Sequence, residues 1–290
     1  MKGIVLAGGS GTRMFPVSQV VNKQLLPVYD KPMIYYPLST LMLSGIRDIL
    51  IISTPKGRAD FEDLLGVGSH LGLNLSYATQ DNPNGLAEAF IIGKEFIGSD
   101  NCALVLGDNL FYGQGLSQKL QTAAKISDGA VVFLHWLADS RPYGVANYSP
   151  EGTLLDITEK PDKPKSNWVV TGLYYYDNHI VDVVKDISPS ARGELEISDV
   201  NNIYLKAGKL ETVNLGRGFT WLDMGSHEAL IEATQFVRTI ELRQGLKISC
   251  IEEIALRMNF IDRDQFSALA YQYKESRYGE YLLRVMQGMH

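Results

Sequence analysis

The chain opens with a short apolar run that stops at a cluster of glycines. Residues 4–6, Ile-Val-Leu, have the pattern of a strand that is buried on both faces. Residues 8–11 follow as Gly-Gly-Ser-Gly, and the near absence of side chains there lets backbone N–H groups approach a phosphate. Thr12 adds a hydroxyl, while Arg13 and Lys23 add cations suited to phosphate oxygens. The stretch therefore predicts a loop that binds a polyphosphate.

The same glycines have a plain alternative, which is a turn that only connects a strand to the next element. Their spacing differs from the G-x-G-x-x-G fingerprint of dinucleotide-binding folds, and no Lys-Ser/Thr pair follows as it does in a P-loop. Arg13 and Lys23 favour phosphate binding over a simple turn, but the residue types alone leave both readings open.

Composition and charge restrict the class of protein. The 290 residues are 45% hydrophobic and 21% charged, as in an ordinary soluble protein of one large domain or two. The net charge of −6 argues against a nucleic-acid partner. No apolar run approaches the ~20 residues that span a bilayer, and no signal-peptide pattern is present. Cys102 and Cys250 are too few for a disulfide framework, so we expect a cytoplasmic protein without a membrane partner.

Strand and helix patterns alternate through the first half of the chain. Expected strands cover residues 49–53, 73–78, 103–106 and 130–134, and expected helices cover residues 33–43, 58–65, 86–96 and 116–124. This alternation predicts an α/β fold with a Rossmann-like, mixed and mostly parallel sheet flanked by helices. Ligands of such sheets bind at the carboxyl ends of the strands, where the glycine loop would lie.

The second half changes from shorter segments to helices. Glycine and proline break residues 141–177 into strands and turns, a helix is expected from residue 193 to about Lys206, and a strand is expected over residues 210–215. Ser226 is a candidate N-cap for a helical extension with expected helices over residues 229–243, 251–258, 262–269 and 278–286. The sequence thus predicts an α/β core of residues 1–225 and a helical C-terminal region of residues 226–290.

Two carboxylates end apolar strands at what would be the carboxyl edge of the sheet. Asp108 follows the strand near residue 106, and Asp223 follows a second apolar segment. Mg²⁺ is commonly held by one or two carboxylates plus phosphate oxygens, so the pair could share one metal ion. A strand-end Asp also caps turns or helices, and the sequence does not bring the two residues together.

Two further polar residues are candidates for ligand binding, and each also has a purely structural explanation. Gln80 begins the polar turn of residues 80–85 and offers the donor and acceptor atoms that suit a base edge, although most such turns only connect elements. Lys160 lies between Glu159 and Pro161, which restricts its freedom, although surface lysines in turns are common.

Taken together, these motifs resemble the glucose-1-phosphate thymidylyltransferases, a sugar nucleotidyltransferase family, over essentially the whole chain. The matching segments are residues 6–13, 23–33, 106–109, 159–161, 170–174, 192–197 and 221–223. The first segment alone indicates the wider sugar nucleotidyltransferase group, and residues 23–33 with 193–197 point to the thymidylyltransferase branch. The resemblance implies in-line attack of α-D-glucose 1-phosphate on dTTP, giving dTDP-glucose and pyrophosphate with Mg²⁺, as the first step toward dTDP-deoxysugars such as dTDP-L-rhamnose.

Carried over residue by residue, the resemblance implies three sets of site residues. The catalytic set is Arg13, Lys23, Lys160, Asp108 and Asp223, of which Asp108 and Asp223 would hold the metal. The nucleotide-binding set is Gly8, Gly11, Thr12, Arg13, Lys23, Gln24, Gln80, Gly85 and Asp108. The sugar-binding set is Asn109, Tyr143, Gly144, Glu159, Lys160, Val170, Glu194 and Trp221.

The resemblance also implies how the chain is divided and assembled. Residues 1–135 would form the nucleotide-binding part, residues 136–225 the sugar-binding part, and residues 226–290 the oligomer and regulatory contacts. Residues 248–257 resemble a stretch that lines a second nucleotide site near a subunit interface, which implies a homotetramer inhibited by an end-product sugar nucleotide. A helix that only packs is the alternative.

The sequence departs from the family pattern beside the expected site. Met14-Phe15, Met224 and Ser226 stand where relatives commonly carry other residues, which bears on substrate preference or rate. A transferase that prefers UTP or another sugar phosphate, and a catalytically weak sugar-nucleotide sensor, are the competing functions. The retained charges of the catalytic set disfavour a sensor, and the lack of hexapeptide repeats argues against an added acyltransferase module.

Overall fold

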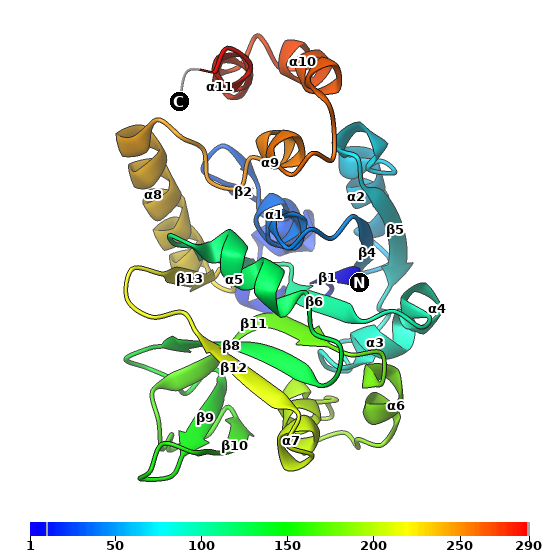
Figure 1. Ribbon diagram of the computed structural model, residues 1–290, viewed down its shortest axis with the longest axis vertical. Helices are drawn as coiled ribbons and strands as arrows, with labels where there is room; N and C mark the ends of the chain where they lie inside the picture. The colour runs from blue at the N-terminus through cyan, green and yellow to red at the C-terminus, as the bar shows by residue number, and fades with distance from the viewer. Residues whose placement is uncertain (10, 289–290) are drawn as a thin grey trace.

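The computed structural model describes residues 1–9 and 11–288, so Ser10 of the glycine loop lies outside the described residues. A nine-stranded sheet forms its centre (Figure 1). Its strands are β1 (Lys2–Ala7), β4 (Asp48–Ser53), β5 (Asn74–Thr79), β6 (Cys102–Leu106), β8 (Ala130–Trp136), β9 (Gly144–Tyr148), β10 (Leu154–Glu159), β11 (Trp168–Tyr176) and β12 (Leu210–Asn214). The strand order is β10-β9-β11-β6-β1-β4-β5, and β8 joins both β11 and β12.

The sheet is mixed, and most of its strands run in one direction. β5, β4, β1 and β6 pair in parallel, as do β8 and β12. β11 is antiparallel to both β6 and β8, and β10 is antiparallel to β9. The predicted α/β architecture with a mixed, mostly parallel sheet is therefore confirmed. The carboxyl ends of β1, β4, β5 and β6 meet at one edge.

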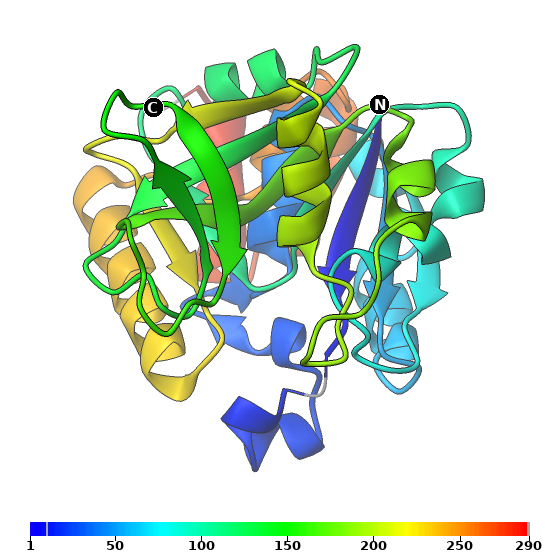
Figure 2. The same cartoon turned by 90° about the horizontal axis from the view of Figure 1, so that it is seen from below.

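Helices cover both faces because the central strands are apolar on both. In β1, Val5 packs in the core on one side and Ile4 and Leu6 pack in the core on the other. α1 (Tyr35–Leu43), α2 (Arg58–Leu65) and α5 (Leu116–Ala123) cover the first side, and α3 (Glu88–Ile92), α4 (Lys94–Ile97), α6 (Ile180–Lys185) and α7 (Ile197–Lys206) cover the second. In Figure 2 the segment after β1 (dark blue) projects beyond the edge of the sheet, where the strand ends.

Two expected helices differ from the structure. The helix expected over residues 86–96 is divided into α3 and α4 at Gly93, where an added Cβ would lie 3.1 Å from the side chain of Ile4. The helix expected from residue 193 begins only at Ile197, because Gly193 has a φ of +76° and the chain there turns instead. The sequence also gave no sign of α6, a short helix between β11 and α7.

A separate two-stranded ribbon corrects the expected position of Asp223. β7 (Asn109–Tyr112) and β13 (Thr220–Asp223) pair antiparallel, outside the main sheet. Asp223 therefore does not end a strand of the central sheet, as the sequence suggested. The ribbon pairs Asp223 with Asn109, and the backbone N–H of Met224 donates to the carbonyl oxygen of Asp108 at 2.9 Å. This pairing brings the two carboxylates together across a long separation in the sequence.

The C-terminal region is helical, as predicted. It contains α8 (His227–Gln244), α9 (Ile251–Arg257), α10 (Arg263–Gln272) and α11 (Arg277–Met286). The hydroxyl oxygen of Ser226 accepts a hydrogen bond from the backbone N–H of Ala229 at 3.2 Å, so the predicted N-cap is confirmed. α9 packs on α1, and α10 and α11 pack beside it (Figure 1). Within residues 1–9 and 11–288, none of the helices combines the length and the apolar character needed to cross a membrane.

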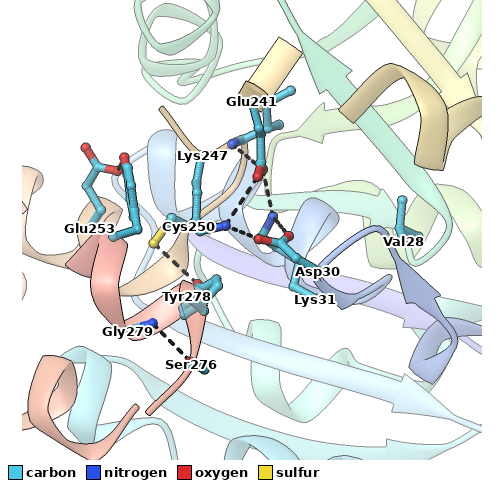
Figure 3. Close-up of polar contacts among 12 residues, drawn as sticks. Val28, Asp30, Lys31, Glu241, Lys247, Cys250, Glu253, Ser276, Tyr278 and Gly279 are labelled. Carbon is cyan, nitrogen blue, oxygen red and sulfur yellow. Dashed lines mark hydrogen bonds and ion pairs between the residues drawn. The ribbon is translucent and has the colours of Figure 1, made fainter. Parts of the chain in front are cut away.

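A buried ionic cluster joins this C-terminal region to the N-terminal half (Figure 3). The hairpin of β2 (Pro27–Val28) and β3 (Lys31–Pro32) supplies Asp30 and Lys31, while α8 and the following turn supply Glu241 and Lys247. Lys31 pairs with Asp30 and, at 3.0 Å, with Glu241, and Lys247 pairs with Asp30 and, at 3.3 Å, with Glu241. The Lys31 side chain is only 1% exposed. Burial raises the pKa of Asp30, but Lys31 and Lys247 outweigh it and hold that pKa below its ordinary value.

Removing one member of the cluster should destabilise the protein. Asp30→Asn takes a carboxylate from between two ammonium groups and should cost about 3 kcal/mol at pH 7, because buried charges are left with fewer partners. The folded-state pKa of Asp30 is lowered, so its contribution is present above the ordinary value of 3.8 and is lost as the pH falls through the folded-state value. Urea unfolding at several pH values should therefore show a difference from the unmodified protein that shrinks below that point.

Asp128→Asn is the matched control for this prediction. Asp128 pairs with Lys209 at 2.7 Å, but both side chains are exposed, so its unfolding midpoint should not change. Equal losses in the two variants, or a difference for Asp30→Asn that grows at low pH, would contradict the assignment of the cluster as a stabilising contact.

Candidate active site

The glycine loop lies at the carboxyl end of β1, next to the end of β6. Gly9 and Gly11 have φ values of +96° and +60°, a conformation that favours glycine. The carbonyl oxygen of Gly11 accepts a hydrogen bond from Ser18 at 2.7 Å, which ties the two sides of the loop together. A hollow of about 360 Å³ lies beside the loop. Its walls include Gly9, Gly11, Ser18, Asn22, Lys23, Thr54, Lys56 and Gly57.

Lys23, which lines this hollow, forms an ion pair with Asp108. Both side chains are largely buried, and Asn109 adds a hydrogen bond to Asp108 Oδ1 at 2.9 Å. Burial raises the pKa of the Asp108 carboxyl, but the charge of Lys23 and these hydrogen bonds outweigh it and hold the pKa below its ordinary value. Asp108 is therefore a carboxylate rather than a carboxylic acid at neutral pH.

Asp223 lies beside Asp108, but its pKa is shifted in the opposite direction. Burial, followed by the negative charge of Asp108, raises the pKa of Asp223 to about 7, although Lys23 and Arg13 act against this shift. An added Cβ at Gly225 would lie 2.8 Å from Arg13 Nη2 and 3.1 Å from Asp223 Oδ1, so Arg13 and Asp223 converge there. The structure thus gathers Arg13, Lys23, Asp108 and Asp223, as the sequence predicted without being able to show it.

The two neighbouring carboxylates can accommodate a divalent cation. Burial and then the charge of Asp108 disfavour the ionised form of Asp223, and a dication between the two carboxyl groups would offset both effects. The residues that the structure describes contain no cluster of three His, Cys, Asp or Glu side chains that could hold a metal. A cation at Asp108 and Asp223 would therefore take its other ligands from phosphate oxygens and water, an arrangement that suits the reluctance of Mg²⁺ to lose water.

Asn109, Tyr143 and Trp221 connect this charged centre to the sugar-side residues. Asn109 is 1% exposed, and its Oδ1 accepts from Trp221 Nε1 at 2.6 Å. The rings of Tyr143 and Trp221 lie 5.0 Å apart in an edge-to-face arrangement. Burial and then the charge of Asp223 raise the pKa of Tyr143 to about 12, so its hydroxyl stays protonated and can donate a hydrogen bond.

A second charged group surrounds Glu159 at the end of β10. Ser198 donates to Glu159 Oε2 at 2.5 Å, and the cations of Lys160 and Arg192 lie 3.7 and 3.8 Å from Oε1. Lys160 has a φ of +41°, and its backbone N–H donates to the carbonyl oxygen of Tyr143 at 3.0 Å. The backbone contact places Lys160 next to Tyr143.

Gln80 and Gly85 lie at the end of β5, beside the glycine loop. The Gln80 carboxamide is so close to Gly8 that a Cβ there would meet Oε1 at 2.6 Å. Gly85 has a φ of +110°, and an added Cβ would lie 2.4 Å from the carbonyl oxygen of Leu195. Because Leu195 follows Glu194, this contact connects the Gln80 group to the sugar-side segment. Gly144 is similarly tight, with Ser198 Oγ 2.8 Å from an added Cβ.

The structure also places three other predicted residues, Gln24, Val170 and Thr12. The Gln24 side chain is buried against Gly107, beneath the site, and the Val170 side chain packs in the apolar core, so a sugar contact would fall to its backbone. Thr12 is exposed and begins a 3-10 turn over Thr12–Met14. Of the departures from the family pattern, Met14 and Met224 are fully buried, so they alter packing.

The sequence interpretation did not include Arg192, which the structure places beside Glu159. Arg192 contacts Glu159 and Glu194 and makes hydrogen bonds to Glu196 at 2.9 to 3.1 Å. These carboxylates fix the guanidinium, so two cations, Lys160 and Arg192, lie near Glu159 where the sequence predicted one. The alternation of residues 192–196, Arg-Gly-Glu-Leu-Glu, was the available signal, because an arginine among carboxylates in a turn has a fixed orientation.

Comparisons with known proteins agree with this geometry. Residues 2–240 match the family model described as Nucleotidyl transferase. A glucose-1-phosphate thymidylyltransferase of Neisseria meningitidis is 55% identical, covering 99% of this chain and 100% of that protein. One from Mycobacterium tuberculosis is 53% identical, covering 99% of each.

Solved structures agree as well. A structure from Bacillus anthracis described as a glucose-1-phosphate thymidylyltransferase with sucrose has a TM-score of 0.76 at 39% identity, covering 82% of this chain and 95% of that one. A UDP-glucose pyrophosphorylase complexed with UDP-glucose has a TM-score of 0.70 at 25% identity, covering 82% and 98%.

Proposed function

Since the chain belongs to the nucleotidyl transferase family and, within it, to the glucose-1-phosphate thymidylyltransferases, we propose that it transfers a thymidylyl group from dTTP to α-D-glucose 1-phosphate. The products are dTDP-glucose and pyrophosphate. One observation carries the assignment beyond the family name: two carboxylates and two cations, Asp108, Asp223, Arg13 and Lys23, converge beside the glycine loop. That arrangement suits the neutralisation of a triphosphate.

The reaction is an in-line displacement at the α-phosphorus of dTTP. A phosphate oxygen of glucose 1-phosphate forms the new P–O bond while the bond to the β-phosphate oxygen breaks, and pyrophosphate leaves. Catalysis of this kind rests on positioning and on stabilising charge. The glycine loop and Lys23 hold the triphosphate, and Arg13 stabilises the charge that develops on the leaving pyrophosphate. Because no covalent bond to the protein forms, no nucleophilic side chain is needed.

Asp108 and Asp223 would hold Mg²⁺ in this proposal. The ion would supply Lewis-acid stabilisation of the phosphate oxygens. Asp108 is ionised because Lys23 and Asn109 stabilise its charge, so it is ready to accept a cation. Lys23 pairs with Asp108, and its ammonium would be available to phosphate oxygens when Asp108 holds the ion. Asn109 keeps the Asp108 carboxylate oriented throughout.

Lys160 and Arg192 bind the phosphate of glucose 1-phosphate. Both cations lie within 4 Å of Glu159, which holds them on the same side of the site as Tyr143. Glu159, Glu194, Gly144 and the backbone of Val170 contact the sugar hydroxyls, with Tyr143 and Trp221 as the walls of that pocket. Residues 1–135 thus serve the nucleotide and residues 136–225 the sugar. The product feeds dTDP-deoxysugar synthesis, such as that of dTDP-L-rhamnose, in the cytoplasm.

Pyrophosphate release tests the substrate assignment. We expect glucose 1-phosphate to support release from dTTP with Mg²⁺, and we expect the rate to fall to background when a chelator removes the metal, because charge on the triphosphate is then left without its cation. Each nucleoside triphosphate is assayed separately. Turnover with UTP but not with dTTP would reverse the nucleotide assignment, and no turnover with any pair would favour a sugar-nucleotide sensor.

The metal ligands have their own test. Asp108→Asn and Asp223→Asn should each lower kcat by at least about a hundredfold, because each removes a charge that faces the metal in the transition state. Circular dichroism should show that both variants keep the fold. Asp186→Asn, a change in an exposed carboxylate after α6, is the control and should leave kcat unchanged. A near-normal Mg²⁺-dependent rate in either site variant would remove that residue from the metal site.

We also propose that the C-terminal region of residues 226–290 builds a homotetramer with a feedback site. Residues 248–257 contain α9, which packs on α1, and Ser249 before it has a φ of +54°. Arg257 pairs with Glu253 at 2.7 Å, and its side chain is 54% exposed, so its guanidinium is accessible to a phosphate. An end-product sugar nucleotide bound here, near a subunit interface, would inhibit the enzyme.

Feedback is measured as the initial rate at saturating dTDP-rhamnose. Inhibition is expected, and Arg257→Ala should weaken it at least about threefold while leaving the uninhibited rate unchanged, because a phosphate contact is lost. Calorimetry should find two nucleotide sites per chain, and light scattering should find a tetramer. Unchanged rates at saturating dTDP-rhamnose, together with one nucleotide site per chain, would rule out the feedback site.

A further inference from the structure

The carboxamide of Gln80 is held in one orientation by its neighbours. Gln80 is 6% exposed, and its Nε2 donates to the carbonyl oxygen of Gly85 at 3.2 Å and to Glu88 Oε2 at 2.7 Å. The carbonyl oxygen of Gly85 and the carboxylate oxygen of Glu88 both act as hydrogen-bond acceptors here. A flipped amide would place Oε1 against two acceptors. The nitrogen therefore faces Glu88 and the oxygen faces away from it.

Glu88 is itself fixed by a second contact. Its other oxygen, Oε1, accepts from Asn84 Nδ2 at 2.8 Å, so Asn84, Glu88 and Gln80 form a short chain of hydrogen bonds. Glu88 is the first residue of α3, whose next residue, Ala89, is buried in the core. The carboxylate thus has a rigid base on one side and a polar partner on the other. It is well placed to orient an amide.

The free end of the Gln80 amide points to the nucleotide side. Oε1 lies beside Gly8, the first residue of the glycine loop, and within residues 1–9 and 11–288 no group donates a hydrogen bond to it. Gln80 consequently offers a base an acceptor and not a donor. The imide of thymine or uracil has an N3–H that donates to such an oxygen, whereas N3 of cytosine carries a lone pair that is repelled by it.

We propose that Glu88 is a positioning residue that makes the site selective for pyrimidines with an N3–H, by fixing the Gln80 carboxamide with its oxygen toward the base. The proposal rests on the proposed function, in which Gln80 contacts the base of the nucleotide. Without Glu88, the Gln80 amide can rotate and offer its nitrogen to N3 of cytosine and its oxygen to the 4-amino group. The selectivity concerns thymine and uracil against cytosine and does not separate dTTP from dUTP.

The test compares nucleotides on one enzyme preparation. kcat/KM is measured for dTTP, dUTP and dCTP, each with glucose 1-phosphate and Mg²⁺. In Glu88→Ala the ratio of kcat/KM for dTTP to that for dCTP should fall about tenfold, which corresponds to one mismatched hydrogen bond, and the change should lie mainly in KM. The ratio for dTTP to dUTP should not change. Direct binding of dTDP and dCDP by calorimetry should show the same loss of preference.

Matched variants separate orientation from a general structural effect. Glu95 is an exposed glutamate in the first turn of the neighbouring α4. Glu95→Ala should leave the kcat/KM ratios of dTTP to dCTP and of dTTP to dUTP unchanged. Glu88→Gln keeps one acceptor oxygen and the side-chain shape. Its ratio of kcat/KM for dTTP to that for dCTP should therefore lie between the ratios of the unmodified protein and of Glu88→Ala. Glu88→Gln serves as the test if Glu88→Ala does not fold. Equal losses with dTTP and dCTP in Glu88→Ala, or an unchanged ratio in Glu88→Gln when Glu88→Ala is unfolded, overturn the proposal.

The activity of the unmodified protein with dTTP distinguishes a failure of the proposed function from a failure of the proposed role of Glu88. If the unmodified protein does not release pyrophosphate from dTTP, the substrate assignment fails whatever the Glu88 variants do. If it does so and the Glu88→Ala ratio equals that of the unmodified protein, only the positioning role of Glu88 is lost.

Discussion

The side chain of Asn109 holds together the centre of the site. Its Nδ2 donates to Asp108 Oδ1 at 2.9 Å, and its Oδ1 accepts both from Trp221 Nε1 at 2.6 Å and from the backbone N–H of Gly172 at 3.1 Å. One almost fully buried amide thus joins the end of β6, the ribbon strand β13 and the central strand β11. A buried amide with its donor and acceptor both satisfied fixes the geometry of all its partners.

The β7–β13 ribbon and the Asn109 side chain together hold two acidic residues side by side at the carboxyl end of the sheet. The β7–β13 ribbon brings Asp223 next to Asp108, and burial, followed by the charge of Asp108, raises the pKa of Asp223. Lys23 and Arg13 relieve part of the repulsion. The backbone hydrogen bonds of the β7–β13 ribbon hold the Asp108 and Asp223 side chains together although their negative charges repel. Such a pair favours the binding of a positive charge. The site is therefore shaped for a cation before any ligand arrives.

The sequence predicted those parts of the molecule that local patterns determine. The apolar strands and amphipathic helices of the first half, the loop after β1 and the Ser226 cap all follow from short stretches whose meaning does not depend on distant residues. The β7–β13 ribbon could not be predicted, because β7 is only Asn109–Tyr112 and its partner comes far later in the chain. The meeting of Asp108 with Asp223 was hidden for the same reason. The local carboxylates Glu194 and Glu196 hold Arg192, but its position beside Glu159 could not be predicted, because Glu159 is distant in the sequence.

The stretch from Lys23 to Lys31 connects the two ends of this architecture. Lys23 pairs with Asp108 at the site, whereas Asp30 and Lys31 pair with Glu241 and Lys247 of the C-terminal region. Between them the stretch is short and well packed, since Leu26 and Val28 are buried. A displacement of the C-terminal helices that strained the ionic cluster would consequently be transmitted toward Lys23 through packed backbone rather than through a flexible linker. The feedback site proposed at α9 would therefore be connected to Lys23 through packed residues.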